Sequence, residues 1–512
     1  MSIHQPAALA EILRRFPGVL PDAPTSLING RPVTGEGETG LVYAATDEAL
    51  ADVSNAPPAL VDRAVAAARD TFEQGGWRDR PAAERSRTLY AVAEKIRAHA
   101  EELAVLHTLE TGIPLAQAQG MHIPRTAENF QFFGEVLSTL SGDTYQQTGR
   151  YLTLVTREPV GVAALIAPWN APLVLSSMKM AACIALGNSM VVKPSEHAPL
   201  SVLRMVALMH EAGLPEGVVQ VVTGPGGSTG QALVDHAGID AVGFIGGTRT
   251  GRLIMQAAGR TLKKVGLELG GKSANIVLDS ADLPAAVDGA LLSIYAGNGE
   301  QCLAGARILV HRAVADRFID AFVQRSAALR VGDPFADGTE LGPMAFRAHY
   351  ERVRDYGTLA RQTDGCTLLT GGGPAEGFER GLFFQPTVVQ VSDNRVRLCQ
   401  EEIFGPFATI QVVTDLDEAL SIANDSDFGL VSYVWSDHMP SILKASRALR
   451  AGTVWVNTPM ARDLRAPFGG VKQSGIGRDG LPGSIELFSE EKTTMLPSRP
   501  LPLPKLGMAG AE

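Results

Sequence analysis

The sequence is poor in cysteine, and this scarcity bears on both compartment and metal binding. Its 512 residues contain only four cysteines, which are Cys183, Cys302, Cys366 and Cys399. None forms a Cys-x-x-Cys pair, and none lies in a Cys/His cluster with the spacing of a zinc site. We therefore expect no disulfide framework and no bound metal, and a reducing, cytoplasmic compartment.

The sequence also lacks a cluster of basic residues. It has 45 lysines and arginines against 55 acidic residues, a net charge of −10, and its basic residues are scattered. Nucleic-acid binding needs a clustered basic face, so we expect no nucleic-acid partner. A small anionic ligand remains compatible with this composition, because nearby arginines matter more to it than the total charge.

No segment reads as a membrane span or an export signal. Residues 1–33 contain acidic residues and prolines, without the basic start and unbroken apolar run of a signal peptide. Residues 159–178 carry no charge and are about long enough to cross a bilayer, but Pro168, Asn170 and Pro172 interrupt them. We predict a buried strand, a loop and a buried helix there, and no membrane partner.

Apolar strands alternate with helices in two series along the chain, without internal repeats. Strands of the first series are predicted at 160–167, 188–194, 218–222 and 241–247, and its helices at 173–186, at 200–212 and from 249 onward. Strands of the second series are predicted at 274–278, 306–310, 387–391, 408–413 and 453–457, and its helices at 283–297, 312–329, 347–361 and 438–449. Nearly continuous apolar strands separated by helices predict parallel sheets covered on both faces.

Three other regions complete the predicted organisation. Long helices are predicted over 60–74 and 84–110, and we expect them to pack on the first sheet. Residues 141–156 alternate like a strand, and together with the tail after residue 486 they look detached from both series. We predict that these two segments form a small extra sheet, or arm, that meets a neighbouring subunit.

Two short motifs carry reactive side chains. Cys302 lies in the segment GNGEQCLAGAR (297–307), just before a predicted strand. The flanking glycines permit a close backbone approach that a cysteine used only for packing would not need. Glu268 lies in ELGGKS (268–273), directly before a Gly-Gly turn. Each residue alone has an ordinary structural explanation, as a core cysteine or a carboxylate at a helix end.

Two further motifs are suited to ligand binding. Asn170 lies in PWNAP (168–172), at the carboxyl end of a buried strand, and ligands of open α/β sheets bind at that edge. The segment GFIGGTRTG (243–251) is a glycine-rich turn between a strand and a helix N-terminus, which suits a pyrophosphate. It does not match the Gly-x-Gly-x-x-Gly pattern, so by itself it is weak evidence for a nucleotide.

Together, in this order and at these spacings, the four motifs resemble the aldehyde dehydrogenase superfamily. The segments KPSE (193–196), EEIFGPF (401–407) and PFGGVKQSGIGR (467–478) extend the resemblance, which runs from about residue 28 to residue 492. It implies NAD-dependent, non-acylating oxidation of an aldehyde to a carboxylic acid.

The resemblance also implies an α/β fold of three parts. These are a Rossmann-like, parallel-sheet NAD-binding domain (1–140 and 157–268), a second α/β catalytic domain (269–485) and a small β oligomerisation arm (141–156 and 486–512). Members of the superfamily generally assemble through such an arm. We therefore expect a homodimer or a homotetramer.

The catalytic roles implied by the resemblance make physical sense. Cys302 would attack the aldehyde as a thiolate, the strongest protein nucleophile near neutral pH. The side-chain amide of Asn170 and the backbone N–H of Cys302 would hold the oxyanion of the resulting thiohemiacetal. Once hydride transfer has produced a thioester, Glu268 would activate the water that hydrolyses it. Lys179 would have a supporting role.

The resemblance assigns a further set of residues to the cofactor. Lys193 and Glu196 would bind the adenine ribose, where a carboxylate accepts the hydroxyls and repels a 2′-phosphate, which favours NAD over NADP. The other expected contacts are Trp169, Gly226, Gly246, Gly247, Gly251, Leu269, Glu402 and Phe404. Many relatives have a serine at the Gly247 position that contacts a phosphate, and its absence here predicts slightly weaker cofactor binding.

Two alternatives compete with this interpretation. A CoA-acylating dehydrogenase of the same superfamily would generally lack the glutamate at the Glu268 position, because CoA resolves its thioester. A non-catalytic protein on the same fold would have no chemical need for Cys302, Glu268 and Asn170 together. The presence of all three residues favours a hydrolytic aldehyde dehydrogenase.

Two segments resemble a narrower branch of the superfamily, the dehydrogenases of hydroxymuconic-type semialdehydes in aromatic catabolism, including 5-carboxymethyl-2-hydroxymuconate semialdehyde dehydrogenases. They are IPRTAENFQFF (123–133) and VNTPMARDLRAPFGG (456–470). The resemblance implies that Arg125 and Arg465, with Arg462 as the less favoured partner, bind a distal carboxylate bidentately.

The substrate assignment has alternatives of its own. The arginines could instead pair on the surface with acids such as Glu128 or Asp463. Leu175, Met178 and Leu303 are expected to line the substrate tunnel, and relatives often carry an aromatic residue at the Met178 position. A roomier tunnel would suit a neutral aromatic or aliphatic aldehyde.

Overall fold

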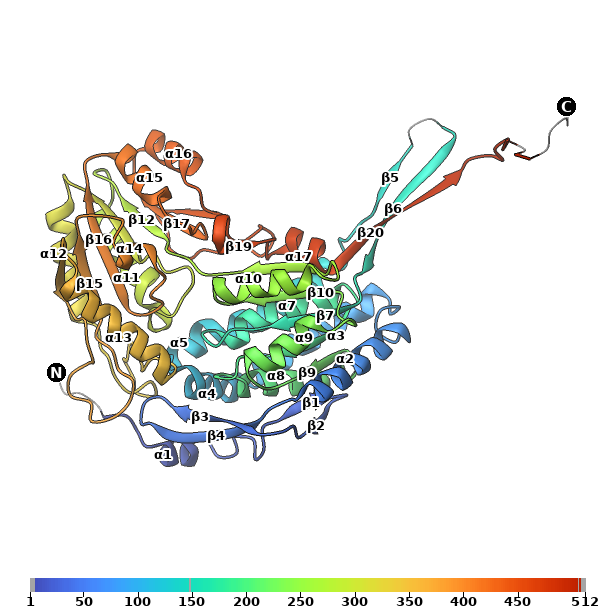
Figure 1. Ribbon diagram of the computed structural model, residues 1–512, viewed down its shortest axis with the longest axis horizontal. Helices are drawn as coiled ribbons and strands as arrows, with labels where there is room; N and C mark the ends of the chain where they lie inside the picture. The colour runs from blue at the N-terminus through green and yellow to red at the C-terminus, as the bar shows by residue number, and fades with distance from the viewer. Residues whose placement is uncertain (1–4, 147–148, 505, 508–512) are drawn as a thin grey trace.

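The computed structural model describes residues 5–146, 149–504 and 506–507, and it has two lobes and a projecting arm (Figure 1). The first lobe is built on an eight-stranded sheet and the second on a seven-stranded sheet. A three-stranded sheet forms the arm, which points away from the second lobe. This arrangement confirms the predicted α/β fold with a small β arm.

The first sheet has the strand order of a doubly wound nucleotide-binding fold. In spatial order its strands are β19 (Gly475–Ile476), β11 (Lys264–Glu268), β10 (Ala241–Ile245), β7 (Val162–Ile166), β8 (Ser189–Lys193), β9 (Val219–Val221), β1 (Ser26–Ile28) and β2 (Arg31–Val33). The five strands from β11 to β9 are parallel, and the others are antiparallel additions at the edges. Since the chain proceeds from β7 outward to β9 and then returns to β10, the topological switch point lies between β7 and β10.

Helices cover both faces of this sheet, as its buried strands predicted. One face carries α7 (Pro172–Ala185) and α8 (Leu200–Glu211), and the other carries α2 (Pro58–Glu73), α9 (Gln231–Asp235) and α10 (Thr248–Ala258). Alternate residues of β7 therefore belong to two different cores.

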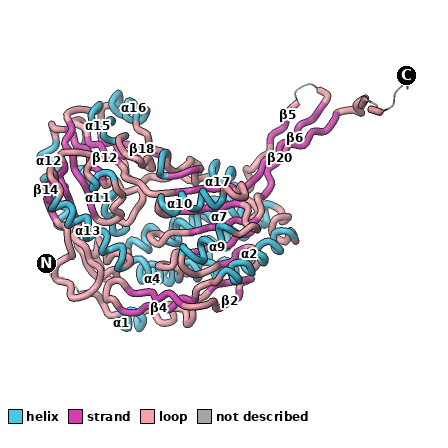
Figure 2. The backbone as a smooth tube through the Cα atoms, in the orientation of Figure 1, coloured by secondary structure: helices cyan, strands magenta, loops and turns pink. Residues whose placement is uncertain are grey.

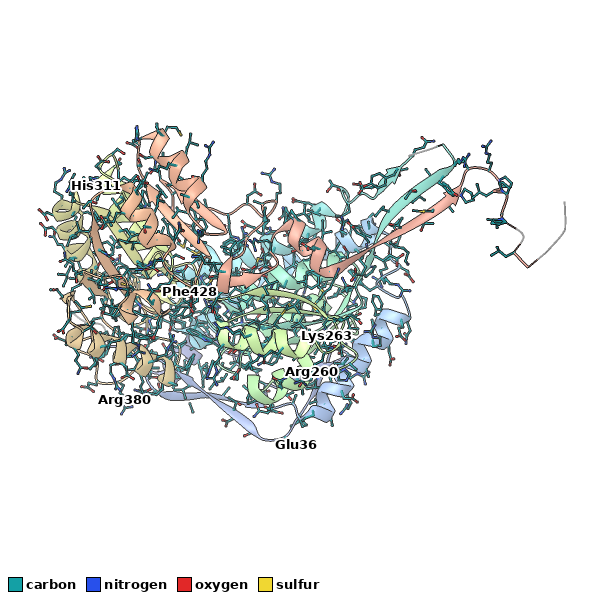
Figure 3. The ribbon with its side chains drawn as sticks, turned by 45° about the horizontal axis from the view of Figure 1, so that its top comes forward. Glu36, Arg260, Lys263, His311, Arg380 and Phe428 are labelled. Atoms are coloured by element: carbon teal, nitrogen blue, oxygen red, sulfur yellow. The ribbon has the colours of Figure 1, made fainter. Side chains whose placement is uncertain are left out.

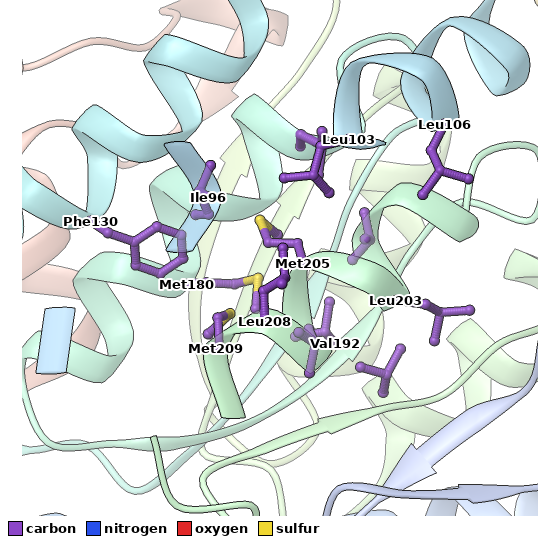
Figure 4. Packing of buried hydrophobic residues seen from close by; sticks show 14 of the residues in the cluster. Ile96, Leu103, Leu106, Phe130, Met180, Val192, Leu203, Met205, Leu208 and Met209 are labelled. Atoms are coloured by element: carbon purple, nitrogen blue, oxygen red, sulfur yellow. The ribbon is translucent and has the colours of Figure 1, made fainter. Parts of the chain in front are cut away.

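A second layer of helices lies outside α7 and α8. It contains α3 (Ala82–Ala98), α4 (Ala100–Thr111), α5 (Leu115–Gln117), the π-helical turn η1 (Ala118–His122) and α6 (Ile123–Val136). The prediction of one helix over 84–110 was wrong, because the backbone at His99 leaves the helical region (φ −109°, ψ 26°) and separates α3 from α4. Figure 4 shows how Ile96, Leu103, Phe130, Met180 and Met205 pack between these helices.

The second sheet is also mostly parallel. Its strands, in spatial order, are β14 (Cys366–Thr370), β15 (Thr387–Val391), β16 (Phe407–Val413), β13 (Arg307–His311), β12 (Ala274–Val277), β17 (Val431–Trp435) and β18 (Thr453–Val456). Only β14 is antiparallel to its neighbour. Its helices are α11 (Leu283–Tyr295), α12 (Ala315–Ala327), α13 (Arg347–Gln362), α14 (Arg397–Gln400), α15 (Leu416–Asn424) and α16 (Met439–Ala448). The sequence did not predict β14, β17 or α15.

The two detached segments pair with each other, as predicted. Strand β6 (Tyr151–Pro159) lies between β5 (Asp143–Tyr145) and β20 (Ser489–Pro497), and all pairing in this sheet is antiparallel. Figure 2 shows this arm as strand pairing that extends beyond the first lobe. Residues 147–148, 505 and 508–512 of the predicted arm lie outside the described residues.

Some elements lie across the expected domain limits. The boundary at 268/269 falls between β11 and β12, but β19 pairs with β11 of the first sheet. Helix α17 (Leu481–Phe488) also packs on the first lobe. At the N-terminus, α1 (Leu9–Arg15) precedes a two-stranded sheet of β3 (Glu38–Tyr43) and β4 (Glu48–Ser54), which the sequence did not predict.

The basic residues are spread over the molecule, and the apolar segment around residue 165 is folded into the first lobe. Figure 3 places Arg260 and Arg380 on different lobes. Residues 159–178 fold into the end of β6, strand β7, a loop and the start of α7. Across the described ranges, no helix combines the length and the apolar character that spanning a bilayer would require.

Candidate active site

Cys302 lies in a constrained turn between η3 (Ala296–Gly299) and β13. The backbone of Gly297, Asn298 and Gly299 has positive φ values of 58°, 59° and 73°. A Cβ atom on Gly299 would come within 2.4 Å of the Gly405 carbonyl carbon, so only glycine fits there. The Asn298 amide donates to the Pro343 carbonyl oxygen at 3.0 Å and accepts the Gly342 N–H at 2.9 Å. These contacts fix the turn that carries Cys302.

Two cavities meet at Cys302. One, which we call the switch-point cleft, has a volume of about 350 Å³, and its lining includes Pro168, Trp169, Asn170, Leu175, Gly246, Gly247, Glu268, Leu269, Gly270, Cys302, Glu402 and Phe404. The other, which we call the α6 cavity, has a volume of about 400 Å³, and its lining includes His122, Arg125, Glu128, Asn170, Ala171, Leu175, Glu300, Cys302, Leu303, Met460 and Arg462. Both cavities share Asn170, Leu175 and Cys302.

The switch-point cleft lies where the sheet topology predicts a ligand site. The loops that follow β7, β10 and β11 contribute Trp169, Gly246 and Leu269, respectively, to its lining. These loops leave the carboxyl ends of adjacent parallel strands, on both sides of the switch point. The fold therefore brings these three predicted cofactor segments into one cleft with Cys302.

Burial sets the protonation of the two reactive groups. It raises the pKa of the Cys302 thiol to about 12, with Glu402 and Glu268 adding to the effect and Arg462 opposing it. Burial, together with Asp479, raises the pKa of Glu268 well above its ordinary value. Oε2 of Glu268 accepts no hydrogen bond from any residue within the described ranges. The site thus places a thiol and a buried glutamate side chain with one unpartnered oxygen in the same cleft.

Lys179 forms a buried ion pair behind Glu268. Its Nζ lies 2.8 Å from Oδ1 of Asp479, and the two side chains are only 4% and 5% exposed. Neither residue lines the switch-point cleft or the α6 cavity. Asp479 raises the pKa of Glu268 and Lys179 lowers it, so this pair acts on Glu268 through charge. Asp479 was not singled out from the sequence, although it directly follows the motif that ends at Arg478.

A hydrogen bond orients the amide of Asn170. Nδ2 of Asn170 donates to the backbone carbonyl oxygen of Glu300 at 2.7 Å. An amide nitrogen carries two hydrogens, so one N–H is left for a ligand. The Glu300 side chain is buried, and its Oε1 accepts the Ala345 N–H at 3.2 Å. Glu300 was also missed in the sequence, where it is simply one polar residue in the Cys302 loop.

Lys193, Glu196 and Gly226 form a separate group outside the lining of the switch-point cleft. Nζ of Lys193 lies 3.5 Å from Oε2 of Glu196, whose Oε1 accepts the Gly226 N–H at 3.2 Å. Burial raises the pKa of Glu196, but the charge of Lys193 and the backbone N–H donors outweigh it, so the pKa is lowered. An ionised carboxylate is thus held at the start of the π-helical turn η2 (Gly226–Gly230).

The glycines after β10 differ in what they require. The Gly246 N–H donates to the Glu268 carbonyl oxygen at 3.0 Å. A Cβ on Gly251 would come within 2.6 Å of the Leu269 side chain, so Gly251 permits close packing. A Cβ on Gly247, in contrast, would meet no atom within 4 Å. A serine side chain at this position would therefore fit.

Aromatic rings and a carboxylate form the far wall of the switch-point cleft. Trp169 makes ring contacts with Phe346, His349 and Phe404, at centroid distances of 5.1, 4.9 and 5.4 Å. Oε1 of Glu402 accepts the Gly271 N–H at 2.9 Å, and burial raises the pKa of Glu402 to about 7. Phe346 and His349 could not be identified from the sequence, because their segment matches none of the motifs described above.

Two arginines of the α6 cavity have nitrogen atoms without partners. Nη1 of Arg125 lies 3.6 Å from Oε2 of Glu128, and Nη2 is buried without a hydrogen bond among the described residues. Arg462 lies 4.0 Å from the ring centroid of Phe468, its Nη2 is 3.3 Å from Sδ of Met178, and its Nε is buried without a partner within the described ranges. Each guanidinium therefore has unused donors.

Arg465 lies outside this arrangement. Its side chain is 78% exposed and pairs bidentately with Asp463, at 3.0 and 2.6 Å, and it lines neither cavity. The expectation that Arg465 rather than Arg462 binds the substrate carboxylate is therefore corrected, because only Arg462 lines the α6 cavity. The exposed Asp463 satisfies Arg465, whereas Arg462 is turned inward over Phe468.

The remaining predicted tunnel residues differ in position. Leu175 and Leu303 line the α6 cavity, and Met178 lies beside it in contact with Arg462.

In the described part of the chain, no group of three or more His, Cys, Asp or Glu side chains is arranged to hold a metal ion.

Comparisons with known proteins agree with this geometry. The family model described as "Aldehyde dehydrogenase family" matches residues 33–494. A 5-carboxymethyl-2-hydroxymuconate semialdehyde dehydrogenase of Escherichia coli is 42% identical over 459 residues, which cover 88% of this chain and 96% of that protein.

Solved structures match over nearly the whole chain. PnpE from Pseudomonas sp. WBC-3, solved with nicotinamide adenine dinucleotide, is 38% identical with a TM-score of 0.92, covering 94% of this chain and 99% of that chain. An indole-3-acetaldehyde dehydrogenase in complex with NAD+ is 37% identical with a TM-score of 0.92, covering 95% and 99% of the two chains. The chain belongs to the aldehyde dehydrogenase family.

Proposed function

We propose that this protein oxidises semialdehydes that carry a distal carboxylate, of the kind produced in aromatic catabolism, to the corresponding dicarboxylic acids. NAD-dependent oxidation of an aldehyde follows from its family and from the solved relatives that bind NAD+. The observation that carries the finer proposal is the pair of partly unpartnered arginines in the α6 cavity.

Residues from both lobes fit NAD+. Glu196, held ionised beside Lys193, offers a carboxylate to the hydroxyls of a ribose and would repel a 2′-phosphate. The glycine turn after β10 leaves its backbone N–H groups close to a helix N-terminus, which suits a pyrophosphate. Glu402 and the aromatic wall around Trp169 would hold the nicotinamide riboside. Bound NAD+ supplies the oxidant, so that aldehyde, water and NAD+ become carboxylate, NADH and two protons.

Cys302, Asn170 and Glu268 would carry the covalent steps. Loss of the Cys302 thiol proton to solvent lets sulfur bond to the aldehyde carbon, and the oxygen becomes an oxyanion that accepts a hydrogen bond from the free N–H of Asn170. Loss of hydride from that carbon leaves an acyl group on sulfur. Glu268 then takes a proton from an attacking water, the C–S bond breaks, and the carboxylic acid leaves.

The charge distribution of the α6 cavity favours an acidic substrate. Burial lowers the pKa of Arg462, Asp479 opposes this effect, and the nearby charge of Arg125 lowers the pKa further, so the two cations repel each other. A carboxylate bound in the α6 cavity between the two guanidinium groups would relieve this repulsion. Its aldehyde end would then point toward Cys302, which lines the same cavity.

A kinetic panel tests this proposal with a matched control in the same loop. We expect Arg462→Met to lower kcat/KM for 6-oxohexanoate about 10- to 100-fold more than for hexanal, because only the acid loses a hydrogen bond to a charged group, whereas loss of the Arg462 charge near Cys302 affects both substrates. Arg125→Met should act in the same direction. Arg465→Met, three residues from Arg462 but exposed, should leave both substrates unchanged.

The alternative substrate is a neutral aromatic or aliphatic aldehyde. It is supported by the apolar residues Leu175 and Leu303 in the α6 cavity and by the indole-3-acetaldehyde dehydrogenase among the similar structures. If wild type uses hexanal as well as 6-oxohexanoate, and Arg462→Met affects both equally, this alternative replaces the carboxylate proposal.

A further inference from the structure

Glu300 connects three segments of the active site, because its backbone and its side chain bond to different neighbours. Its carbonyl oxygen accepts the Asn170 amide N–H at 2.7 Å, and its side-chain Oε1 accepts the Ala345 N–H at 3.2 Å. Its own N–H donates to the Gly297 carbonyl oxygen at 3.0 Å, within the turn that carries Cys302. Glu300 therefore ties this turn to the loop after β7 and to the segment before α13.

The side chain of Glu300 is enclosed by the protein. Only 1% of it is exposed, and its Oε1 lies 3.4 Å from Nε2 of His349. The same nitrogen is 2.7 Å from the Phe404 carbonyl oxygen, which can only accept a hydrogen bond, so Nε2 carries a proton. The Ala345 N–H and the imidazole of His349 thus hold the Glu300 carboxyl group in one place.

The surroundings of Glu300 favour an uncharged carboxyl group. Burial raises its pKa well above the ordinary glutamate value, although the Ala345 N–H opposes this effect. Burial, together with the charge of Arg352, lowers the pKa of His349 to about 3, so the imidazole is uncharged near neutral pH. An uncharged group two residues before Cys302 does not repel an oxyanion that forms there. Glutamine should therefore replace Glu300 with little change in the local charge.

We propose that Glu300 is a positioning residue whose side chain fixes the separation of the two oxyanion donors. This inference rests on the oxyanion role proposed for Asn170, with the Cys302 N–H as the second donor. The Asn170 amide is held by the carbonyl oxygen of Glu300, and the Cys302 N–H lies two residues along the same turn. The carboxyl group anchors this turn to the segment before α13. A shift of the Glu300 peptide would move both donors relative to the sulfur, and a misplacement of about 1 Å can cost about 100-fold in rate.

The test measures the rate of the NADH burst, which reports the chemical step, in variants of this side chain. Glu300→Ala and Glu300→Leu keep the backbone carbonyl but remove the acceptor for the Ala345 N–H, so both should slow the burst about 10- to 100-fold. Leucine fills the space that alanine leaves, which separates loss of the anchor from creation of a cavity. The KM values for NAD+ and aldehyde should change less than about threefold, because a positioning residue acts on the transition state. Glu300→Gln keeps a side-chain acceptor and should return the burst rate to within about threefold of wild type.

A double-mutant cycle with Asn170→Ala shows whether Glu300 acts through this donor. In the Asn170→Ala background, Glu300→Ala should slow the burst at least about fivefold less than it does in wild type, because one donor that it positions has already been removed. Losses that simply multiply would mean that the two residues act independently, and they would overturn the inference. If Asn170→Ala alone leaves the burst unchanged, the oxyanion role itself fails and this inference fails with it, so the two failures are distinguishable.

Glu110→Ala is the matched control, because Glu110 is also a buried glutamate that accepts backbone N–H groups. Its oxygens bond to Leu200 and Ser201 at the start of α8, and it lines neither cavity. The control should lower the melting temperature but leave the burst rate within about twofold of wild type. An unchanged burst in both Glu300→Ala and Glu300→Leu, an equally slow burst in Glu300→Gln, an equal loss in Glu110→Ala, or a loss confined to the KM for aldehyde would overturn the assignment.

Discussion

The switch-point cleft and the α6 cavity meet at one sulfur atom but are built from different kinds of parts. The switch-point cleft is lined largely by loops that directly follow β7, β10 and β11, so its shape depends on where these strands end. The α6 cavity is formed by side chains from η1, α6, α7, the Cys302 turn and the loop around Met460. Sheet topology therefore determines where the switch-point cleft lies. The packing of segments that are distant in sequence determines the lining of the α6 cavity.

The largest expected effect is at the junction of the two cavities. Cys302→Ser should lower turnover by about 10⁴-fold or more, because the nucleophile is lost from both half-reactions. NAD+ affinity, measured by calorimetry, should stay within about twofold, since the cofactor contacts remain in place. Turnover near the wild-type rate would show that Cys302 is not the nucleophile.

Glu268→Gln should separate the two half-reactions. We expect a single-turnover burst of NADH to remain while steady-state turnover falls about 10²- to 10⁴-fold, because the base that activates water is lost. Burial raises the pKa of Glu268, so wild-type turnover should increase with pH through a range above the ordinary glutamate value. Parental steady-state turnover in the variant would contradict the water-activation role.

Asn170→Ala should slow the chemical step about 100-fold or more, because one oxyanion donor is worth ~3–4 kcal/mol. The amide is oriented by the Glu300 carbonyl rather than by a reacting group, so the loss should appear in kcat. Stopped-flow measurement of the NADH burst would test this, and an unchanged burst rate would mean that another donor holds the oxyanion.

Assembly offers a test away from the junction. We expect a dimer or a tetramer in light scattering, and an active monomer would contradict this prediction. Deletion of the tail from residue 489 onward should dissociate the assembly, because it removes β20, which pairs along the whole of β6.

The smallest expected effect concerns Gly247, at the start of α10. A side chain there meets no neighbouring atom, and serine is a favoured residue at a helix N-cap. Gly247→Ser should lower the KM for NAD+ about two- to fivefold by adding one hydroxyl contact to a phosphate. An increase in KM would show that the open space is needed by the cofactor itself.

The switch-point cleft and the α6 cavity also differ in how well their residues could be predicted from the sequence. Strands β7 to β10 of the first sheet, five strands of the second sheet, the arm and the segments around Asn170, Glu268 and Gly246 could be predicted, because each depends on a local pattern or motif. The helix break at His99, the edge strands of the first sheet and the strands β11, β14 and β17 could not, since tertiary packing determines them. Arg462 and Arg465 lie only three residues apart in the same loop, and the local sequence does not show which of the two side chains turns toward the α6 cavity. His122, Glu300 and Asp479 gain their surroundings only from contacts distant in sequence.

Calorimetry with Cys302→Ala tests most directly whether the two sides are independent and whether the α6 cavity selects carboxylates. Adipate, the expected product of 6-oxohexanoate, should bind this variant. Adding Arg462→Met should weaken adipate binding about 10- to 100-fold and leave NAD+ affinity unchanged, because only a charged hydrogen bond in the α6 cavity is removed. Unchanged adipate binding, or an equal loss of NAD+ affinity, would contradict the account.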